Sequence, residues 1–172
     1  MSKNSNIFLI GGATATTKST MSLNIMKKHN IVHKLGTGFL REMCKIYFKK
    51  KDLPSLYNHS FGTIKTKDPF KNLYLQSLPI NKMIKIALQR AEREGTSIII
   101  EGVNVIPGLT NHKNAKKIIL AVRSEEKHKN LIFKNKTHLN REVKIDDFKR
   151  IRIIQNRLIN LAKKNNWKVK YI

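Results

Sequence analysis

The stretch that most constrains the fold is residues 7–20, IFLIGGATATTKST. Four apolar residues precede two glycines, a small polar loop, and a lysine and two hydroxyl residues at the start of a helical pattern. This order is typical of a buried strand, a phosphate-binding loop and a helix N-terminus. Residues 12–19 fit the spacing G-x-x-x-x-G-K-S/T at every fixed position except one, because Thr17 replaces the second glycine. An ordinary strand–turn–helix junction is the alternative interpretation.

In a loop of this kind, backbone N–H groups and the helix dipole hold phosphate oxygens. We expect Lys18 to reach the β- and γ-phosphates and Ser19 to ligate Mg²⁺. Without a ligand, Lys18 is expected to face solvent. The Cβ of Thr17 costs about 1–3 kcal/mol if the backbone there needs a glycine-like conformation. The predicted nucleotide-binding residues are Gly12, Ala13, Thr14, Ala15, Thr16, Thr17, Lys18, Ser19 and Thr20.

Length and composition favour one globular domain over residues 1–172. The longest apolar runs, such as Ile98–Ile100, are too short to span a bilayer, and the start of the chain does not have the pattern of a signal peptide. Cys44 is the single cysteine, so an internal disulfide is excluded and a cytoplasmic location is expected. No membrane association is predicted.

A net charge of +24 accompanies this composition. Such a charge suits nucleic acid or highly anionic small substrates. The alternative is compositional drift, because lysine, asparagine and isoleucine are used heavily throughout and the basic residues are spread along the whole chain. The sequence does not decide between these explanations.

Hydrophobic periodicity predicts five strands alternating with helices. Strands are expected near 7–11, 31–35, 97–100, 117–122 and 167–172, and helices near 18–28, 39–50, 80–94, 123–138 and 146–164. Residues 51–79 contain three prolines and are expected to form loops with short helical turns. The predicted buried stripes of the first two helices are Met21, Leu23, Ile25 and Met26, and Leu40, Met43, Ile46 and Tyr47.

Strands that alternate with helices indicate a parallel sheet covered on both faces. Right-handed crossovers bring the carboxyl ends of the first and third strands together, at the edge where ligands bind. Glu101 ends the third strand and should therefore lie near the loop. There it can organise Mg²⁺ through water or accept a proton from a substrate hydroxyl. A solvent-facing glutamate at a strand end is the alternative.

Other basic residues are weaker candidates. Arg41 can clamp a phosphate or carboxylate of the substrate, or it can be a solvated arginine on a helix surface. Residues 123–141 form a basic, lid-like segment whose charges can neutralise a transferring phosphoryl group, although charge runs are often simply solvated. Its basic residues include Lys127, Lys129, Lys134, Lys136 and Arg141. The six histidines lack metal-ligand spacing, so no structural zinc is predicted.

Several separate stretches together resemble the archaeal-type 2-phosphoglycerate kinases, over most of the chain from Ile7 to Trp167. The most specific stretch is Glu101-Gly102-Val103-Asn104-Val105-Ile106-Pro107-Gly108. The others are Gly11-Gly12 through Thr20, Arg41-Glu42-Met43, residues 53–56, His59-Ser60-Phe61, residues 90–97, Glu125-Glu126-Lys127-His128, and Phe148 with Ile151, Arg152, Ile154 and Gln155.

The resemblance implies an α/β fold of the P-loop NTPase type, a three-layer sandwich with a mostly parallel sheet of about five strands and helices on both faces. It also implies transfer of a phosphoryl group from ATP, with Mg²⁺, to the 3-hydroxyl of 2-phosphoglycerate. Lys18 and Glu101 would be catalytic, and Arg41, Ser60 and Asn104 would bind the substrate.

The sequence departs from the family at several of these positions. Ala15 and Thr17 replace glycines, Asn104 replaces a histidine, and lysines stand where lid arginines are expected. The first hypothesis is therefore an ATP-dependent kinase for a phosphorylated hydroxy-acid, and the second is a catalytically weak P-loop protein that binds a nucleotide. Nucleic-acid binding or a polynucleotide-kinase-like activity depends on charge alone and is not favoured. The oligomeric state is not predicted.

Overall fold

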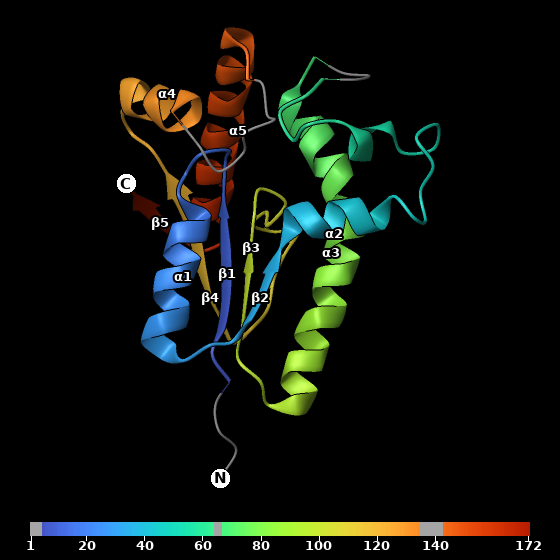
Figure 1. Ribbon diagram of the computed structural model, residues 1–172, viewed down its shortest axis with the longest axis vertical. Helices are drawn as coiled ribbons and strands as arrows, with labels where there is room; N and C mark the ends of the chain where they lie inside the picture. Colours follow the sequence, from blue (N-terminus) through green and yellow to red (C-terminus); the bar gives the residue numbers. More distant parts are fainter. Residues whose placement is uncertain (1–4, 64–66, 135–142) are drawn as a thin grey trace.

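Residues 5–63, 67–134 and 143–172 are described by a computed structural model, and they contain one five-stranded sheet in the order β2-β3-β1-β4-β5 (Figure 1). Every neighbouring pair in this sheet is parallel. The strands are β1 (Ile7–Gly12), β2 (His33–Gly36), β3 (Ile98–Glu101), β4 (Ala115–Ala121) and β5 (Lys168–Tyr171). All five predicted strands are confirmed, with ends displaced by one or two residues.

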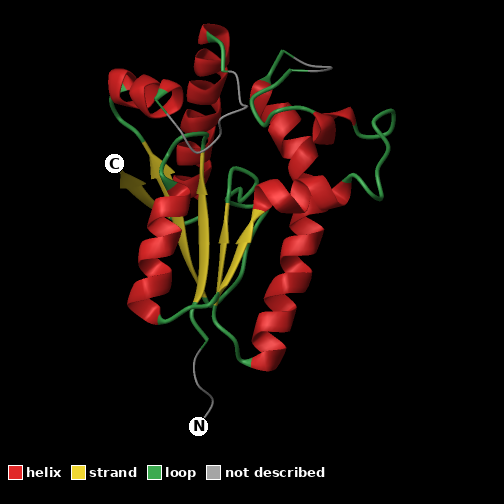
Figure 2. Ribbon diagram, viewed as in Figure 1, coloured by secondary structure: helices red, strands yellow, loops and turns green. Residues whose placement is uncertain are grey.

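Helices connect these strands and cover both faces of the sheet (Figure 2). They are α1 (Lys18–His29), α2 (Thr37–Cys44), α3 (Pro69–Glu94), α4 (Glu125–Phe133) and α5 (Ile145–Lys164), with a short 3-10 turn η1 (Pro54–Tyr57). None of the helices within the described ranges is long and apolar enough to cross a membrane.

The three layers follow from the two-residue period of β1. Ile7 and Leu9 face the larger core, which α3 and α5 cover, whereas Phe8 and Ile10 face a smaller core, which α1 covers. Since both faces of β1 are packed, the strand reads as a continuous apolar run. The predicted α/β fold of the P-loop type, with helices on both faces of a parallel sheet, is confirmed.

The predicted loop over 51–79 is wrong from residue 69, because α3 begins there and extends to Glu94. Pro69 occupies the first turn, where its missing N–H is not needed, and the Asp68 side chain accepts a hydrogen bond from the Phe70 N–H at 2.9 Å. Pro79 lies inside the helix and removes one backbone hydrogen bond. It is buried, so packing of this segment outweighs the local signal of a proline.

The predicted helix over 39–50 ends early, because α2 stops at Cys44. Leu40 and Cys44 are buried one turn apart and face α3, so the other side of α2 points away from the core. Residues that were expected in its buried stripe are instead exposed, with exposed fractions of 50% for Met43, 79% for Ile46 and 78% for Tyr47.

The predicted burial of one residue of α1, Leu23, is also wrong. Met21, Ile25 and Met26 pack against the smaller core, but Leu23 is half exposed and Ser22 is the buried residue of this helix. The Ser22 hydroxyl donates to the Lys18 carbonyl at 2.9 Å, which satisfies it inside the structure.

Candidate phosphate-binding site

The loop between β1 and α1 begins at a position that needs glycine. Gly12 has φ of +149°, and a Cβ there would lie 2.6 Å from both the Leu120 carbonyl oxygen and the Thr16 Oγ1. Neither neighbour leaves room for a side chain. The first glycine of the predicted motif is therefore fixed by a close approach of the loop to β4.

Two residues without glycine's freedom follow in a left-handed conformation. Ala15 has φ of 58° and Thr17 has φ of 53°. Both are positions where the resemblance described above implies glycine. The conformation costs an alanine or threonine about 1–2 kcal/mol, so other contacts must hold the loop in this path.

Lys18 folds back over the loop instead of simply facing solvent. Its Nζ donates to the Ala13 carbonyl at 2.6 Å and to the Thr16 Oγ1 at 3.3 Å. The buried Thr16 hydroxyl in turn donates to the same Ala13 carbonyl at 3.0 Å. The expectation of a solvent-facing lysine is thus corrected, because the loop itself offers the ammonium group an oxygen ligand.

Ser19 and Glu101 lie side by side, although 82 positions separate them in the chain. The Ser19 hydroxyl donates to Glu101 Oε1 at 3.0 Å, and Lys34 Nζ lies 4.0 Å from the same oxygen. Glu101 is only 8% exposed and is placed by β3, which pairs with β1 so that Ile10 lies opposite Glu101. The expected meeting of the loop and this acid is observed.

These groups fit Mg²⁺ as a metal. A hydroxyl and a carboxylate are hard oxygen donors, and Mg²⁺ is commonly held by one or two protein oxygens together with water and substrate phosphates. Over the described part of the chain, three or more histidine, cysteine, aspartate or glutamate side chains do not gather into a metal site. A metal here would therefore depend on Ser19, Glu101 and the phosphates of a bound substrate.

Arg41 and Asn104, two of the predicted substrate-binding residues, belong to one hydrogen-bond network. Arg41 donates to Glu42 Oε1 at 2.9 Å and to the Asn58 carbonyl at 3.3 Å, and Gln76 donates to that same carbonyl at 3.2 Å. Asn104 is buried and donates to Gln76 Oε1 at 3.0 Å and to Ser77 Oγ at 2.9 Å. The network ties α2 and α3 to the segments that follow η1 and β3.

Ser60, the third of these residues, is buried in the segment that follows η1. Its neighbours His59 and Phe61 stack with ring centroids 5.2 Å apart. Substrate contacts by Arg41, Ser60 and Asn104 stay predictions.

Sequence reasoning gave no role to His128, which contacts the loop from α4. Its Nε2 lies 2.9 Å from the Thr14 carbonyl oxygen, and the residue is fully buried. Burial lowers the pKa of this imidazole below its ordinary value, partly opposed by the bond to Thr14. The signal that could have indicated it is its place in the helix after the fourth strand, whose end lies beside the loop.

Only part of the predicted lid-like segment is described. Lys127 and Lys129 lie on α4 and Lys134 at its end, while Lys136 and Arg141 lie outside the described residues. Lys129 Nζ is 5.3 Å from the centre of the Phe148 ring, so this lysine stacks on α5.

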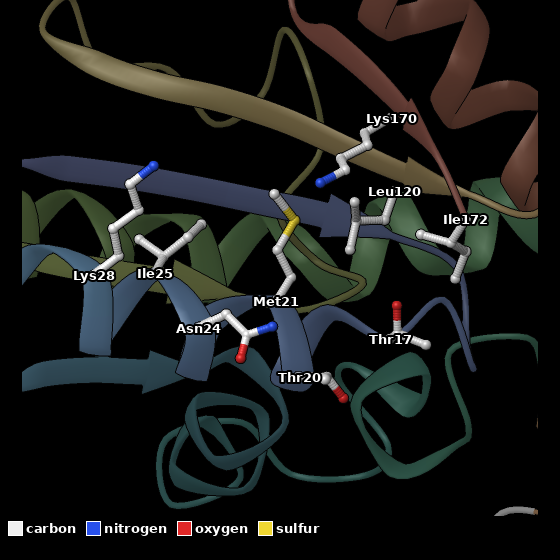
Figure 3. A pocket seen from close by; sticks show the side chains of 9 residues that line it. All are labelled: Thr17, Thr20, Met21, Asn24, Ile25, Lys28, Leu120, Lys170 and Ile172. Atoms are coloured by element: carbon white, nitrogen blue, oxygen red, sulfur yellow. The ribbon is translucent and has the colours of Figure 1, made fainter.

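A pocket of about 290 Å³ adjoins the end of the loop (Figure 3). It lies between α1 and the ends of β4 and β5, with Thr17 below Ile172 in the view of Figure 3. Its volume is near the lower end for small-ligand pockets. Its lining residues are Thr17, Thr20, Met21, Asn24, Ile25, Lys28, Leu120, Lys170 and Ile172.

Together, the strand–loop–helix of β1 and α1 and the acid on the neighbouring parallel strand define an α/β fold of the P-loop NTPase type. No protein-family model matches the chain.

Curated relatives, however, include archaeal proteins named 2-phosphoglycerate kinase. The protein from Methanococcus maripaludis strain C6 is 27% identical over 185 residues, covering 96% of this chain and 59% of that protein. The Methanopyrus kandleri protein is 31% identical over 135 residues, covering 72% of this chain and 41% of that protein. The protein from Thermococcus kodakarensis is 34% identical over 107 residues, covering 58% of this chain and 37% of that protein. The chain thus spans about half the length of the curated relatives it matches.

Among solved structures, a deoxyadenosine kinase from M. mycoides, with the products dCMP and dCDP bound, is similar with a TM-score of 0.48 and 12% identity. The match covers 96% of this chain and 89% of that one. The fold assignment rests on the sheet order and the loop described above, and not on this similarity.

Proposed function

We propose that this chain is an ATP-dependent kinase that transfers the γ-phosphoryl group to the hydroxyl of an anionic hydroxy-acid such as 2-phosphoglycerate. The observation that carries the proposal is the hydrogen bond between Ser19 and Glu101 at the end of the phosphate loop. It places a hydroxyl and a carboxylate beside the N-terminus of α1, where phosphates bind. The name borne by the curated relatives supports the same activity.

In this proposal the loop and the first turn of α1 hold the phosphates through N–H groups that have no partner within the helix. Lys18 leaves the Ala13 carbonyl, to which it now donates, and neutralises charge on the β- and γ-phosphates. The catalytic work of the protein is then positioning and charge stabilisation, because phosphoryl transfer needs little covalent chemistry from the enzyme.

Ser19 and Glu101 would hold Mg²⁺, which when bound supplies positive charge to the phosphate oxygens. Alternatively, Glu101, a buried carboxylate at the carboxyl end of β3, would accept the proton of the acceptor hydroxyl. Arg41, Ser60 and Asn104 are the proposed contacts for the acceptor. The net charge of +24 suits two multiply anionic substrates.

The test is turnover of ATP with Mg²⁺ against a panel of phosphorylated hydroxy-acids, 2-phosphoglycerate included. Lys18→Ala should lower the rate by about 100-fold or more, which corresponds to about 2.7 kcal/mol of transition-state stabilisation. Lys27→Ala is the matched control, because it removes the same group from an exposed position on the same helix. Full activity in Lys18→Ala would refute the phosphate-binding role of the loop.

A catalytically weak nucleotide-binding protein is the second candidate. The observation that favours it is the left-handed backbone at Ala15 and Thr17, where side chains replace glycines of the resembled family. Tight binding of ATP without turnover of any hydroxy-acid would support this candidate over the first. Nucleic-acid binding, the third hypothesis, predicts an affinity that falls steeply as salt rises. No binding of RNA or DNA at low salt would remove it.

A further inference from the structure

The connection from β4 to α4 is fixed by two side chains of α5. Gln155 accepts from the Val122 N–H at 2.9 Å and donates to the Val122 carbonyl at 3.0 Å. Arg152 donates to the Val122 carbonyl at 2.8 Å and to the Arg123 carbonyl at 3.3 Å. The Ser124 side chain then caps α4 by accepting from the Lys127 N–H at 3.1 Å. The first turn of α4 therefore has a position set by α5.

His128 projects from this fixed turn onto the phosphate loop. Its ring packs edge-on against Phe148 of α5, with centroids 5.7 Å apart, and its Nε2 lies 2.9 Å from the Thr14 carbonyl. A carbonyl only accepts, so Nε2 must carry the proton. The Nδ1 atom is buried without a hydrogen-bond partner among the described residues, which favours the neutral ring.

The phosphate loop needs such a contact because its backbone is unfavourable for its own residues. Ala15 directly follows the bonded carbonyl and has φ of 58°. The Ala13 carbonyl is held by Thr16 and Lys18, but Lys18 must release it if it is to reach a phosphate. The bond from His128 to Thr14 comes from the buried side of the loop and can persist while a ligand is bound.

We propose that His128 is a positioning residue that holds the loop in its phosphate-receptive conformation before the nucleotide arrives. This inference rests on the proposed function for the identity of the ligand, but the ordering of the loop is independent of it. Without the bond, the loop would adopt another conformation in part of the molecules. The apparent affinity for the nucleotide would then fall in proportion to the fraction of molecules whose loop can still bind it. The expected loss is about tenfold, the size of one hydrogen bond.

The experiment compares three variants with the wild type. His128→Phe keeps a ring against Phe148 but loses the donor, and His128→Gln keeps an amide donor of similar reach. Phe148→Leu loosens the same packing without removing the donor. Binding of MgADP is measured by calorimetry, and hydrogen exchange of the backbone amides of residues 13–17 is measured without ligand.

His128→Phe should bind MgADP about tenfold more weakly and exchange its loop amides about tenfold faster. His128→Gln and Phe148→Leu should stay within about threefold of the wild type in both measurements. Equal losses in His128→Phe and Phe148→Leu, or unchanged exchange in His128→Phe, would overturn the inference. If His128→Phe does not fold, the other two variants decide. The inference would be overturned if His128→Gln binds MgADP more weakly and exchanges its loop amides faster, while Phe148→Leu behaves like the wild type in both measurements. If the wild type binds no MgADP, the proposed function fails, while the exchange data still decide whether His128 orders the loop.

Discussion

Thr17→Gly is expected to stabilise the protein, although most substitutions destabilise. Thr17 precedes α1 with φ of 53° and ψ of 28°, and its side chain makes no capping hydrogen bond to the helix. The residue therefore carries the cost of a left-handed conformation, about 1–2 kcal/mol, without the usual compensation of a cap. Glycine adopts this conformation freely.

The net effect is smaller than the strain, because glycine also makes the unfolded chain more flexible. That entropic penalty is about 0.4–1 kcal/mol. The difference leaves a gain of about 0.5–1 kcal/mol in the free energy of unfolding. For a chain of this length, the midpoint of thermal unfolding should rise by about 1–4 °C. Nucleotide affinity should stay unchanged or increase.

Urea unfolding followed by tryptophan fluorescence measures this effect, because Trp167 is the single tryptophan and is buried. Thr20→Gly is the matched control. Thr20 also lines the pocket, but it lies within α1, where glycine should cost about 0.3–0.5 kcal/mol. If Thr17→Gly lowers stability as Thr20→Gly does, the argument from backbone strain is wrong.

Three further predictions concern side chains around the loop. Lys18→Ala should lower the free energy of unfolding by about 0.5–1.5 kcal/mol, because a hydrogen bond to the loop is lost, whereas Lys27→Ala should change it by less than about 0.5 kcal/mol; urea unfolding of both variants measures this. Glu101→Gln should keep its contact with Ser19 but raise the Mg²⁺ concentration needed for half-maximal turnover at least tenfold, and an unchanged Mg²⁺ titration would argue against a metal at this site. The pKa of His128 is lowered from 6.5 in the folded protein, chiefly by burial and also by the nearby positive charges of Arg152 and Lys18, and is raised in part by the Thr14 carbonyl and Glu125. The imidazole therefore binds a proton more readily in the unfolded chain, so the free energy of unfolding should be at its full value above about pH 6.5 and should decline as the pH falls below it. His128→Phe should show a smaller decline in urea unfolding measured over this pH range, and equal profiles for the variant and the wild type would contradict the prediction.

The elements that the sequence predicted well are those whose signals are local. An apolar run before two glycines predicted β1 and the loop, and α3 ends at Glu94, as predicted, with Gly95 in a left-handed conformation (φ of +63°) directly after it. The evenly spaced apolar residues of α5 gave its bounds within one residue. Alternation of these elements was enough to predict a parallel sheet, and thereby the meeting of Ser19 with Glu101.

Other features were decided by packing between distant parts of the chain. Pro79 continues a helix because the residues of α3 before and after it are buried, and α2 exposes Met43 because only the other side of α2 faces α3. No local pattern distinguishes these outcomes from the predicted ones. A proline or a helical stripe of apolar residues indicates a local conformational preference, but it does not indicate which other element packs against the segment.

The sequence by itself determined the order of strands and helices along the chain, the loop after β1 and the acid that meets it, because each depends on backbone preference and on the rules of parallel sheets. Only the tertiary structure decided how the loop is held. Thr14 and His128 are 114 positions apart, and their hydrogen bond exists because β4 pairs with β1 and α5 fixes the start of α4. A contact over such a distance depends on the assembled sheet, and so no stretch of sequence contains it.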